Sequence, residues 1–504
     1  MRDTLLARGG CLAGSIADLG LTEVSRSFAH SLNMVAMPWP RKHRPARERF
    51  TDYFDRAREY RLPRQPGRAY RCRMSSSSDV SAARSVAFDL LRSVLARRKS
   101  FDDAMAIHDG FRRLPPRDRG FARLIAATTL RRLGQLDALI DLCLEKPLPK
   151  AGEAVRDILR MATAEMLFLG VAPHASVDSA VTLVETRKLA KFKGLTNAVL
   201  RRLSRDGKTM LAEIPETRNV PEWMLAAWSE GFGGDIAERI ASASLREPSL
   251  DISVKSDPEG WAKKLGAAIL PTGSLRRGFD GPVDAMPGFA EGAWWVQDAA
   301  AALPVQLLGD IKGKRVLELC AAPGGKTAQL AAAGARVTAV DRSEPRLGRL
   351  RRNLARLRLD AETLVADAAT WQPEELFDAV LLDPPCTSTG TIRRHPDILH
   401  SKSPEDLPKL TALQDRLLAN AAAMVKPGAV LVFCTCSLQP EEGERRIEAF
   451  LAADKTLERA PLDPKDLPGL EACVNDAGDF RSFPFHLAER GGLDGFFAAR
   501  LIRA

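Results

Sequence analysis

Apolar residues recur every three to four positions between residues 79 and 205, which is the spacing of amphipathic helices. The apolar stripe contains Val86, Leu90, Leu91, Val94 and Leu95 in one stretch, and Leu159, Met166 and Leu169 in another. This pattern predicts an all-α domain, which we bound at residues 74–215. Its polar faces carry many arginines, as in TLRRLGQL and NAVLRRLSR, and fit a solvated helix face as well as an RNA-binding surface.

The pattern changes between residues 216 and 296. A tryptophan-containing helix, VPEWMLAAWSEGFG, precedes LDISVKS, in which Leu250, Ile252 and Val254 alternate with polar residues as in a half-buried strand. We expect a small α+β linker subdomain here. The adjacent Trp294 and Trp295 are interpreted as packing residues rather than base-stacking ones.

Short apolar runs alternate with helical segments in residues 297–504. The runs are RVLELCA, RVTAVD, FDAVLLDPP, AVLVFCTCS and FFAARLI. Near-continuous valine and leucine runs separated by helices are typical of a parallel sheet covered on both faces. We therefore expect a doubly wound, Rossmann-like α/β domain with its ligand over the carboxyl ends of the strands.

Composition narrows the class of protein. The chain has 504 residues, of which 45% are hydrophobic and 27% charged, as in an average soluble globular protein. Eight irregularly spaced cysteines form neither a secreted disulfide framework nor a zinc pattern, so reduced thiols are expected. We find no apolar run long enough to span a membrane and no signal-peptide core, and expect a cytoplasmic protein.

Residues 1–73 mix proline and arginine without a sustained period and carry +8 of the net charge of +10. We expect this segment to be mostly disordered. Two interpretations stay open: a basic RNA-binding arm, or a stretch outside the natural protein if translation starts at Met74. The net charge of the whole chain is therefore weak evidence that the folded residues 74–504 bind an anionic partner.

A glycine turn follows the strand RVLELC and precedes a helix. It consists of Cys320, Ala321, Ala322, Pro323, Gly324, Gly325 and Lys326. Such a turn lets a ligand approach the backbone and the free N–H groups of the helix. Cys320 stands where a phosphate loop needs its first glycine, and the dinucleotide pattern is also absent. A smaller nucleoside ligand remains, and S-adenosylmethionine, with a ribose and no phosphate, fits the turn.

Carboxylates at successive strand ends support a nucleoside. Asp341, 16 residues after Gly325, can accept hydrogen bonds from both ribose hydroxyls. Asp367 follows the probable third strand and is expected on the adenine side. Either residue alone could merely cap a helix, but their places at successive strand ends favour a ligand site.

Two further strands end in cysteine motifs, Asp383-Pro384-Pro385-Cys386 and Thr435-Cys436-Ser437. Addition of a thiolate to carbon 6 of a pyrimidine turns carbon 5 into a nucleophile that can attack a methylsulfonium. Asp383 could stabilise the adduct near N3. Cys434 lies on the same strand face as Cys436, deeper in the strand, and is expected to pack in the core.

These motifs resemble those of a known family. LELCAAPGGKT, DPPCTSTGTIRRHPDI, FCTCSLQPEEGE and DGFFAARL are similar to the motifs of the RsmB/NOP family of RNA cytosine-C5 methyltransferases. The helical region PHASVDSAV…KGLTNAVLRR is similar to a domain of the antitermination factor NusB. The resemblance covers about residues 79–504.

The resemblance implies roles for the site residues. Residues 320–326, Asp341, Asp367 and Asp383 would surround S-adenosylmethionine; Cys436 would be the nucleophile, and Cys386 would assist product release, as a base on the C5 proton. Because the proline-cysteine motif also resembles that of DNA cytosine methyltransferases, Cys386 is the alternative nucleophile.

The resemblance further implies 16S rRNA as the substrate, and we expect a monomer without a metal ion. Alternatives are a noncatalytic RNA-binding or ribosome-assembly factor, and a cytosine-C5 methyltransferase acting on tRNA or another rRNA. A nucleotide-dependent dehydrogenase is disfavoured by the missing glycines of a dinucleotide site.

Overall fold

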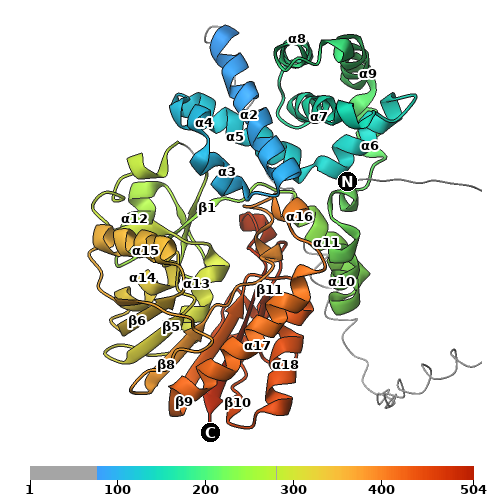
Figure 1. Ribbon diagram of the computed structural model, residues 1–504. Helices are drawn as coiled ribbons and strands as arrows, with labels where there is room; N and C mark the ends of the chain where they lie inside the picture. Colours follow the sequence, from blue (N-terminus) through green and yellow to red (C-terminus); the bar gives the residue numbers. More distant parts are fainter. Residues whose placement is uncertain (1–76, 280) are drawn as a thin grey trace, which may run out of the picture. The chain divides into compact units, whose positions relative to one another are not determined.

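The computed structural model describes residues 77–279 and 281–504, which belong to one compact unit (Figure 1). The expectations for residues 1–73 lie outside this range. Within the described residues, no helix combines the length and apolarity that crossing a membrane requires.

The first segment is all-α, as expected. Its helices are α2 (Ser77–Arg97), α3 (Phe101–Ile107), α4 (Asp109–Arg113), α5 (Pro116–Arg131), α6 (Leu133–Cys143), α7 (Glu153–Leu167), α8 (Pro173–Thr186) and α9 (Lys193–Ala212). Their apolar stripes meet in one cluster that contains the fully buried Leu90, Ile125, Leu159 and Leu200. Burial of these stripes stabilises the bundle, since isolated helices of this length are marginal in water.

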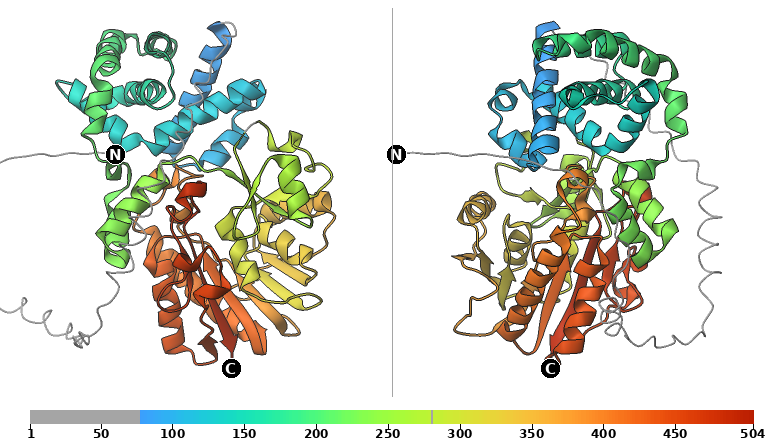
Figure 2. Two further views of the ribbon diagram at one scale, coloured as in Figure 1. Left: turned by 180° about the vertical axis from the view of Figure 1, so that it is seen from behind. Right: turned by 45° about the vertical axis from the view of Figure 1, so that its right-hand side comes forward.

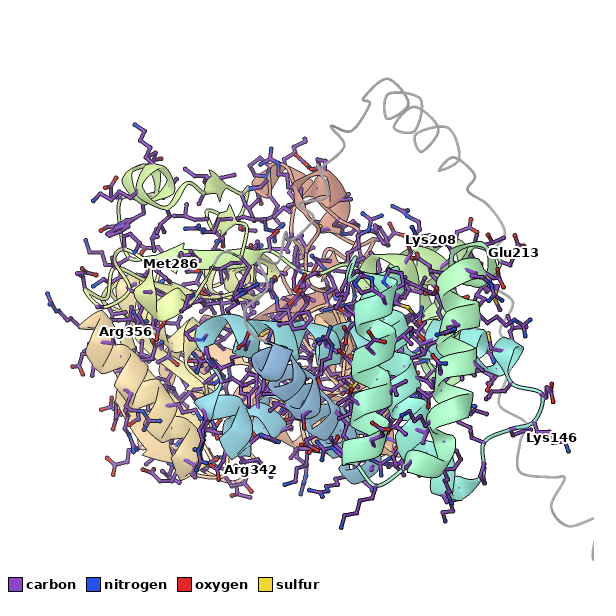
Figure 3. All side chains as sticks on the ribbon, turned by 90° about the horizontal axis from the view of Figure 1, so that it is seen from above. Lys146, Lys208, Glu213, Met286, Arg342 and Arg356 are labelled. Carbon is purple, nitrogen blue, oxygen red and sulfur yellow. The ribbon has the colours of Figure 1, made fainter. Side chains whose placement is uncertain are left out.

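The arginines of this segment divide into two groups. Arg131 is buried and donates to the carbonyl oxygen of Arg393 at 2.9 Å, while Arg132 donates to Glu216 at 2.9 Å. These two, from TLRRLGQL, therefore hold the structure together. The arginines of NAVLRRLSR and the following Lys208, labelled in Figure 3, are exposed on α9 and remain available to a partner.

The middle segment contains two helices and a small sheet. Its elements are α10 (Glu222–Phe232), α11 (Gly234–Ser244), β1 (Leu250–Val254), α12 (Pro258–Leu265), β2 (Ala268–Ile269), β3 (Leu275–Arg277) and β4 (Trp294–Val296). The strands form an antiparallel sheet in the order β2-β3-β1-β4. Trp294 and Trp295 are 0% and 2% exposed, as packing residues are.

Residues 216–296 nevertheless contribute to three cores. Leu270 and Trp295 belong to the core of the α/β domain. The strands share a small cluster with α12. Helices α10 and α11 instead pack against Ile392, Leu438 and Phe483 of the last segment. The helices thus support the loops at the end of the large sheet.

The last segment is the α/β domain. Its elements are α13 (Ala299–Gln306), β5 (Arg315–Leu319), α14 (Gly325–Ala332), β6 (Arg336–Asp341), α15 (Glu344–Leu357), β7 (Glu362–Val365), β8 (Phe377–Leu382), α16 (Ile398–Ser401), α17 (Asp406–Met424), β9 (Val425–Thr435), α18 (Glu444–Ala453), β10 (Leu457–Arg459), β11 (Phe480–Ser482) and β12 (Phe496–Arg503). The strand order is β10-β12-β9-β8-β5-β6-β7, and β11 also pairs with β12.

The sheet is mixed rather than wholly parallel. Strands β7, β6, β5, β8 and β9 are parallel neighbours, as the sequence predicts. The FFAARLI strand, β12, runs antiparallel to β9 and to β10, which corrects the expectation for that run. The apolar pattern of a strand does not encode its direction, which the connections on either side decide.

Helices cover both faces of the large sheet (Figures 1 and 2). Successive side chains of its strands alternate between these two helix layers. On one face Val316 and Val432 share a cluster with α13, α14 and α15; on the other, Leu317 and Leu431 share one with α17 and α18. Cys434 is fully buried in the first cluster, and Cys436 packs against it. The two cysteines therefore share a face, and Cys434 is a core residue.

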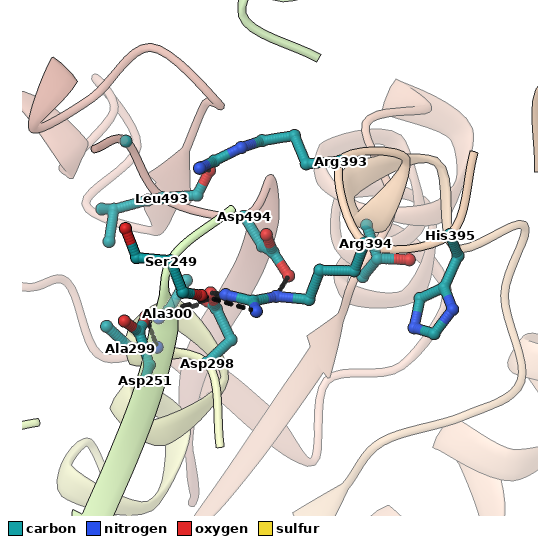
Figure 4. A network of polar contacts seen from close by, with 12 residues as sticks. Ser249, Asp251, Asp298, Ala299, Ala300, Arg393, Arg394, His395, Leu493 and Asp494 are labelled. Carbon is teal, nitrogen blue, oxygen red and sulfur yellow. Dashed lines mark hydrogen bonds and ion pairs between the residues drawn. The ribbon is translucent and has the colours of Figure 1, made fainter. Parts of the chain in front are cut away.

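Arg394 joins the small sheet to the α/β domain (Figure 4). Its Nε donates to Asp494 at 2.8 Å and its Nη2 to Asp298 at 2.5 Å. The same Nη2 lies 3.7 Å from Asp251, and Nη1 donates to the carbonyl oxygen of Ser249 at 3.1 Å. One guanidinium thus contacts three buried carboxylates from different segments, and one of them, Asp251, is also paired with Arg276 at 2.6 Å.

We expect Arg394→Leu to destabilise the fold in a pH-dependent way. Burial raises the pKa of Asp494 from 3.8 to about 6, so stability already falls as pH rises through that window. Without the guanidinium the pKa of Asp494 rises further, and the stability of the fold continues to fall to higher pH. The loss should reach about 3 kcal/mol near pH 8 and be smaller near pH 5.

Urea unfolding followed by tryptophan fluorescence measures this loss. The control is Arg416→Leu, which removes an exposed arginine of α17 and should leave the midpoint nearly unchanged. Equal midpoint shifts for the two variants at both pH values would show that the Arg394 charge does not hold this network.

Candidate active site

The turn 320–326 lies between β5 and α14 at the carboxyl end of the sheet. Cys320 and Gly324 have φ angles of 62° and 99°. A Cβ on Gly324 would lie 2.6 Å from Cγ of Leu350, so only glycine fits there. No side chain caps the start of α14, which leaves its first N–H groups for a ligand.

Asp341 ends β6 beside this turn and is 2% exposed. Its Oδ2 accepts from the Ala322 N–H at 3.1 Å and its Oδ1 from the Ser343 N–H at 2.9 Å. A carboxylate offers about four acceptor sites, so two more hydrogen bonds can be accepted. The carboxylate is thus oriented by the turn and still able to accept from a diol.

Asp367 follows β7 and is exposed. Its Oδ1 accepts from the Ala369 N–H at 3.0 Å, and its carbonyl oxygen accepts from the N–H groups of Thr370 and Trp371. The described contacts of Asp367 are therefore those of a local turn cap. A contact with adenine stays a prediction.

Lys326 and Asp383 form an ion pair, with Nζ and Oδ2 2.6 Å apart. Burial lowers the pKa of Lys326, but the Asp383 carboxylate more than offsets it and the net pKa is raised. Lys326 is therefore a permanent cation within the turn. The pair links the cofactor turn after β5 to the proline-cysteine motif after β8.

Glu318 is a member of this site that the sequence pattern did not single out. It is 1% exposed and accepts from Oγ1 of Thr327 at 2.5 Å. Burial raises its pKa to about 8. Glu318 lies on β5 at a position with the spacing of an ordinary strand residue. The one signal in the sequence is that a charged residue stands inside an apolar run.

The two motif cysteines meet at the ends of β8 and β9. Their Sγ atoms are 3.5 Å apart. Hydrogen bonding to Cys436, followed by burial, raises the pKa of Cys386 well above its usual value. Cys434 and Cys320 also have raised pKa values, chiefly because they are buried, with that of Cys320 near 12. The spacing brings together two thiols that cannot both ionise easily.

One buried carboxylate, that of Glu442, fixes the loops behind both thiols. It is 0% exposed and accepts from the Thr387 N–H at 3.0 Å, from Thr387 Oγ1 at 2.5 Å and from Ser437 Oγ at 2.6 Å. Nε2 of Gln414 donates to it at 3.0 Å. Thr387 and Ser437 directly follow Cys386 and Cys436, so Glu442 ties the two cysteine motifs together.

Backbone contacts close the same site. The Gly390 N–H donates to the carbonyl oxygen of Cys436 at 3.0 Å. A Cβ on Gly390 would lie 1.8 Å from the carbonyl oxygen of Gly495, so the loop after Cys386 passes against β12 only because glycine stands there. From α10, Nε1 of Trp228 donates to Gln439 at 2.7 Å.

Comparisons with known proteins identify the families that this chain resembles. Residues 305–502, which include the turn and both cysteine motifs, match the family of 16S rRNA methyltransferases RsmB/F. Residues 81–205 match the NusB family. The helical segment and the α/β domain thus match two separate families.

Similar proteins cover most of the chain. Ribosomal RNA small subunit methyltransferase B of Pseudomonas putida is 35% identical over 444 residues, covering 84% of this chain and 98% of its own. The protein of that name from Klebsiella pneumoniae is 33% identical over 448 residues, covering 83% and 98%. The crystal structure of PH0851 has the same fold, with a TM-score of 0.66 at 24% identity over 85% of this chain and 100% of that chain.

We expect Glu442→Gln to expose Cys386. The change keeps the side chain's size but replaces acceptors of hydrogen bonds from Thr387 and Ser437 with an amide. Losing charge-assisted hydrogen bonds of about 1.5 kcal/mol should increase local opening more than tenfold. Alkylation of Cys386 by iodoacetamide, followed by peptide mass spectrometry, should accelerate by that factor.

Glu441→Gln is the matched control, because Glu441 is the partly exposed neighbour and pairs with Arg445 instead. Its Cys386 alkylation should match that of the parent. If Glu442→Gln protects Cys386 as well as the parent does, Glu442 does not hold the loops.

Proposed function

Since the chain belongs to the RsmB/F family of 16S rRNA methyltransferases, we propose that it methylates carbon 5 of a cytosine in 16S rRNA, with S-adenosylmethionine as the donor. It is an RNA methyltransferase by family. The observation that carries the choice of carbon 5 is the 3.5 Å approach of two thiols beside the cofactor turn. A pyrimidine carbon 5 needs a nucleophile at carbon 6, and thiols supply one.

The residues present fit S-adenosylmethionine. The turn 320–326 offers glycine backbone and the uncapped start of α14, and Asp341 has acceptor sites for two ribose hydroxyls. Lys326 and Asp383 lie at the inner side of that turn. When bound, the cofactor supplies an electrophilic methyl group.

Cys436 acts first in the proposed sequence. Its thiolate forms a bond with carbon 6, and the electron pair of the 5,6 double bond makes carbon 5 the nucleophile that takes the methyl group. Cys386 keeps its proton at this stage because its pKa is raised by the neighbouring sulfur. Only one of the two thiols need therefore carry charge during attack.

Cys386 acts second. Once the Cys436 sulfur is bonded to carbon 6, the largest cause of the raised pKa of Cys386 is removed, and Cys386 releases its own proton to solvent. Its thiolate removes the C5 proton, the electron pair re-forms the double bond, and the Cys436 thiolate leaves. Cys386 then holds the proton that carbon 5 has lost.

Asp383 serves both ligands in this proposal. Its Oδ2 is held by Lys326, which fixes the carboxyl group at the end of β8. Oδ1 is then free to interact with the N3 edge of the cytosine while the ring is saturated. Asp383 thereby stabilises the adduct and holds the substrate next to the cofactor turn.

The helical segment supplies RNA affinity in this proposal. The exposed arginines of α9 are suited to phosphate contacts, whereas Arg131 and Arg132 are engaged in the fold. We therefore assign chemistry to the α/β domain and part of the recognition to α9.

We expect Asp341→Ala to weaken S-adenosylmethionine binding at least tenfold, about 1.4 kcal/mol, because the ribose loses a charged acceptor. Isothermal titration calorimetry measures the change. Asp360→Ala removes a carboxylate beyond α15 and serves as the control, with unchanged affinity expected. A folded Asp341→Ala protein that binds the cofactor as the parent does would remove Asp341 from the site.

The two thiols should respond differently to alanine. Cys436→Ala should abolish methylation of a 16S rRNA transcript and any covalent RNA adduct. Cys386→Ala should accumulate a protein–RNA complex that survives denaturing electrophoresis, since attack proceeds but the C5 proton stays. Adduct in Cys436→Ala and none in Cys386→Ala would exchange the roles. Transfer to a tRNA transcript but not to 16S rRNA would assign the other substrate.

A further inference from the structure

Helix α15 and three residues that flank it are unusually rich in arginine. Residues 342–358 contain seven arginines and a single carboxylate, that of Glu344. The arginines are Arg342, Arg346, Arg349, Arg351, Arg352, Arg356 and Arg358. This density contrasts with the near-neutral balance of residues 74–504 as a whole, which carry only +2.

Most of these arginines share one side of the helix. The buried face consists of Leu347, Leu350, Leu354 and Leu357, which pack into the core cluster on that side of the sheet. Spacings of three and four residues place an arginine row beside that face, made of Arg342, Arg346, Arg349, Arg352 and Arg356. We call these five residues the α15 row.

The α15 row begins at the cofactor site and ends at the small sheet. Arg346 donates to the carbonyl oxygen of Ala322 and has Nη1 3.5 Å from Asp341. Arg356 donates to the carbonyl oxygens of Phe289 and Trp294 at 2.7 and 3.1 Å. Figure 3 labels Arg342 and Arg356 towards opposite ends of α15.

Three arginines of the row have no acidic partner among the described residues. Arg342, Arg349 and Arg352 are exposed, and none of them pairs with a carboxylate among the residues that the structure describes. Glu344, the one acid of the segment, pairs with Arg351 on another side of the helix. Like charges three and four residues apart repel each other, so a bound anion would stabilise this row.

We propose that the α15 row binds the phosphate backbone of the substrate RNA next to the target nucleotide. The helical part of the row, from Arg346 to Arg356, extends about 15 Å along the helix axis, which exceeds the reach of a single small anion and suits successive phosphates. Arginine rather than lysine supports the same ligand, because its planar fork matches phosphate oxygens. This inference rests on the proposed function.

The α15 row lies beside the cofactor site, whereas the arginines of α9 lie in the helical segment. It starts at Asp341, so phosphates bound along it belong to the nucleotides that flank the reacting base. Contacts there hold the RNA strand while the base occupies the site, whereas α9 can only bind RNA through another part of the molecule's surface.

The test removes three charges from the row in the full chain. The variant carries Arg342→Gln, Arg349→Gln and Arg352→Gln. The control carries Lys409→Gln, Arg416→Gln and Lys455→Gln, which removes the same charge from exposed positions on α17 and after α18. Binding of a 16S rRNA transcript is measured at several salt concentrations, and S-adenosylmethionine binding by calorimetry.

We expect the row variant to bind the transcript at least tenfold more weakly near 0.15 M salt, with a salt slope reduced by about two to three. Its cofactor affinity should stay within twofold of the parent. The control should bind RNA as the parent does.

Unchanged RNA affinity in the row variant, or an equal loss in the control, would overturn the role of the row. Failure of the parent protein to methylate RNA would instead contradict the proposed function. A methyl-transfer assay, separate from the binding measurements, detects that failure.

Discussion

The carboxylate of Glu442 accepts hydrogen bonds from residues that directly follow each of the two motif cysteines. Those residues belong to loops after β8 and β9, so the two thiols approach each other only as closely as this buried acid allows. The Sγ–Sγ distance of 3.5 Å, and with it the raised pKa of Cys386, depends on this tie. A fully buried carboxylate is costly unless its oxygens are satisfied, and here four donor groups satisfy them, of which the Thr387 N–H donates to both oxygens.

The stretch from Cys386 to His400 connects the two thiols to the small sheet and to the helical segment. Arg394 contacts the carboxylates of Asp251 in the small sheet, Asp298 before α13 and Asp494 in the loop before β12. Asp397 accepts from the Phe101 N–H at 3.1 Å, and His400, neutral because burial lowers its pKa to about 4, donates to the carbonyl oxygen of Leu130 at 2.7 Å. One loop therefore contacts a thiol, the small sheet and the helical segment, and the position of Cys386 depends on all of them.

The sequence pattern was informative where the chemistry is local. The glycine turn, the carboxylate after β6 and the shared face of Cys434 and Cys436 follow from strand periodicity and from the residue types beside it. The antiparallel β12 and the structural roles of Arg131 and Arg132 do not, because direction and pairing depend on distant parts of the chain. Glu442 lies 55 residues from Thr387, and nothing in its own neighbourhood distinguishes it from a surface glutamate.

In the proposed reaction Cys436 attacks carbon 6 and Cys386 removes the C5 proton. An RNA transcript containing 5-fluorocytosine tests it directly, because the fluorine at carbon 5 cannot be removed as a proton and the adduct persists. After incubation with S-adenosylmethionine and proteolysis, mass spectrometry identifies the modified cysteine. We expect the RNA on Cys436, whereas RNA attached to Cys386 would contradict these roles of the two thiols.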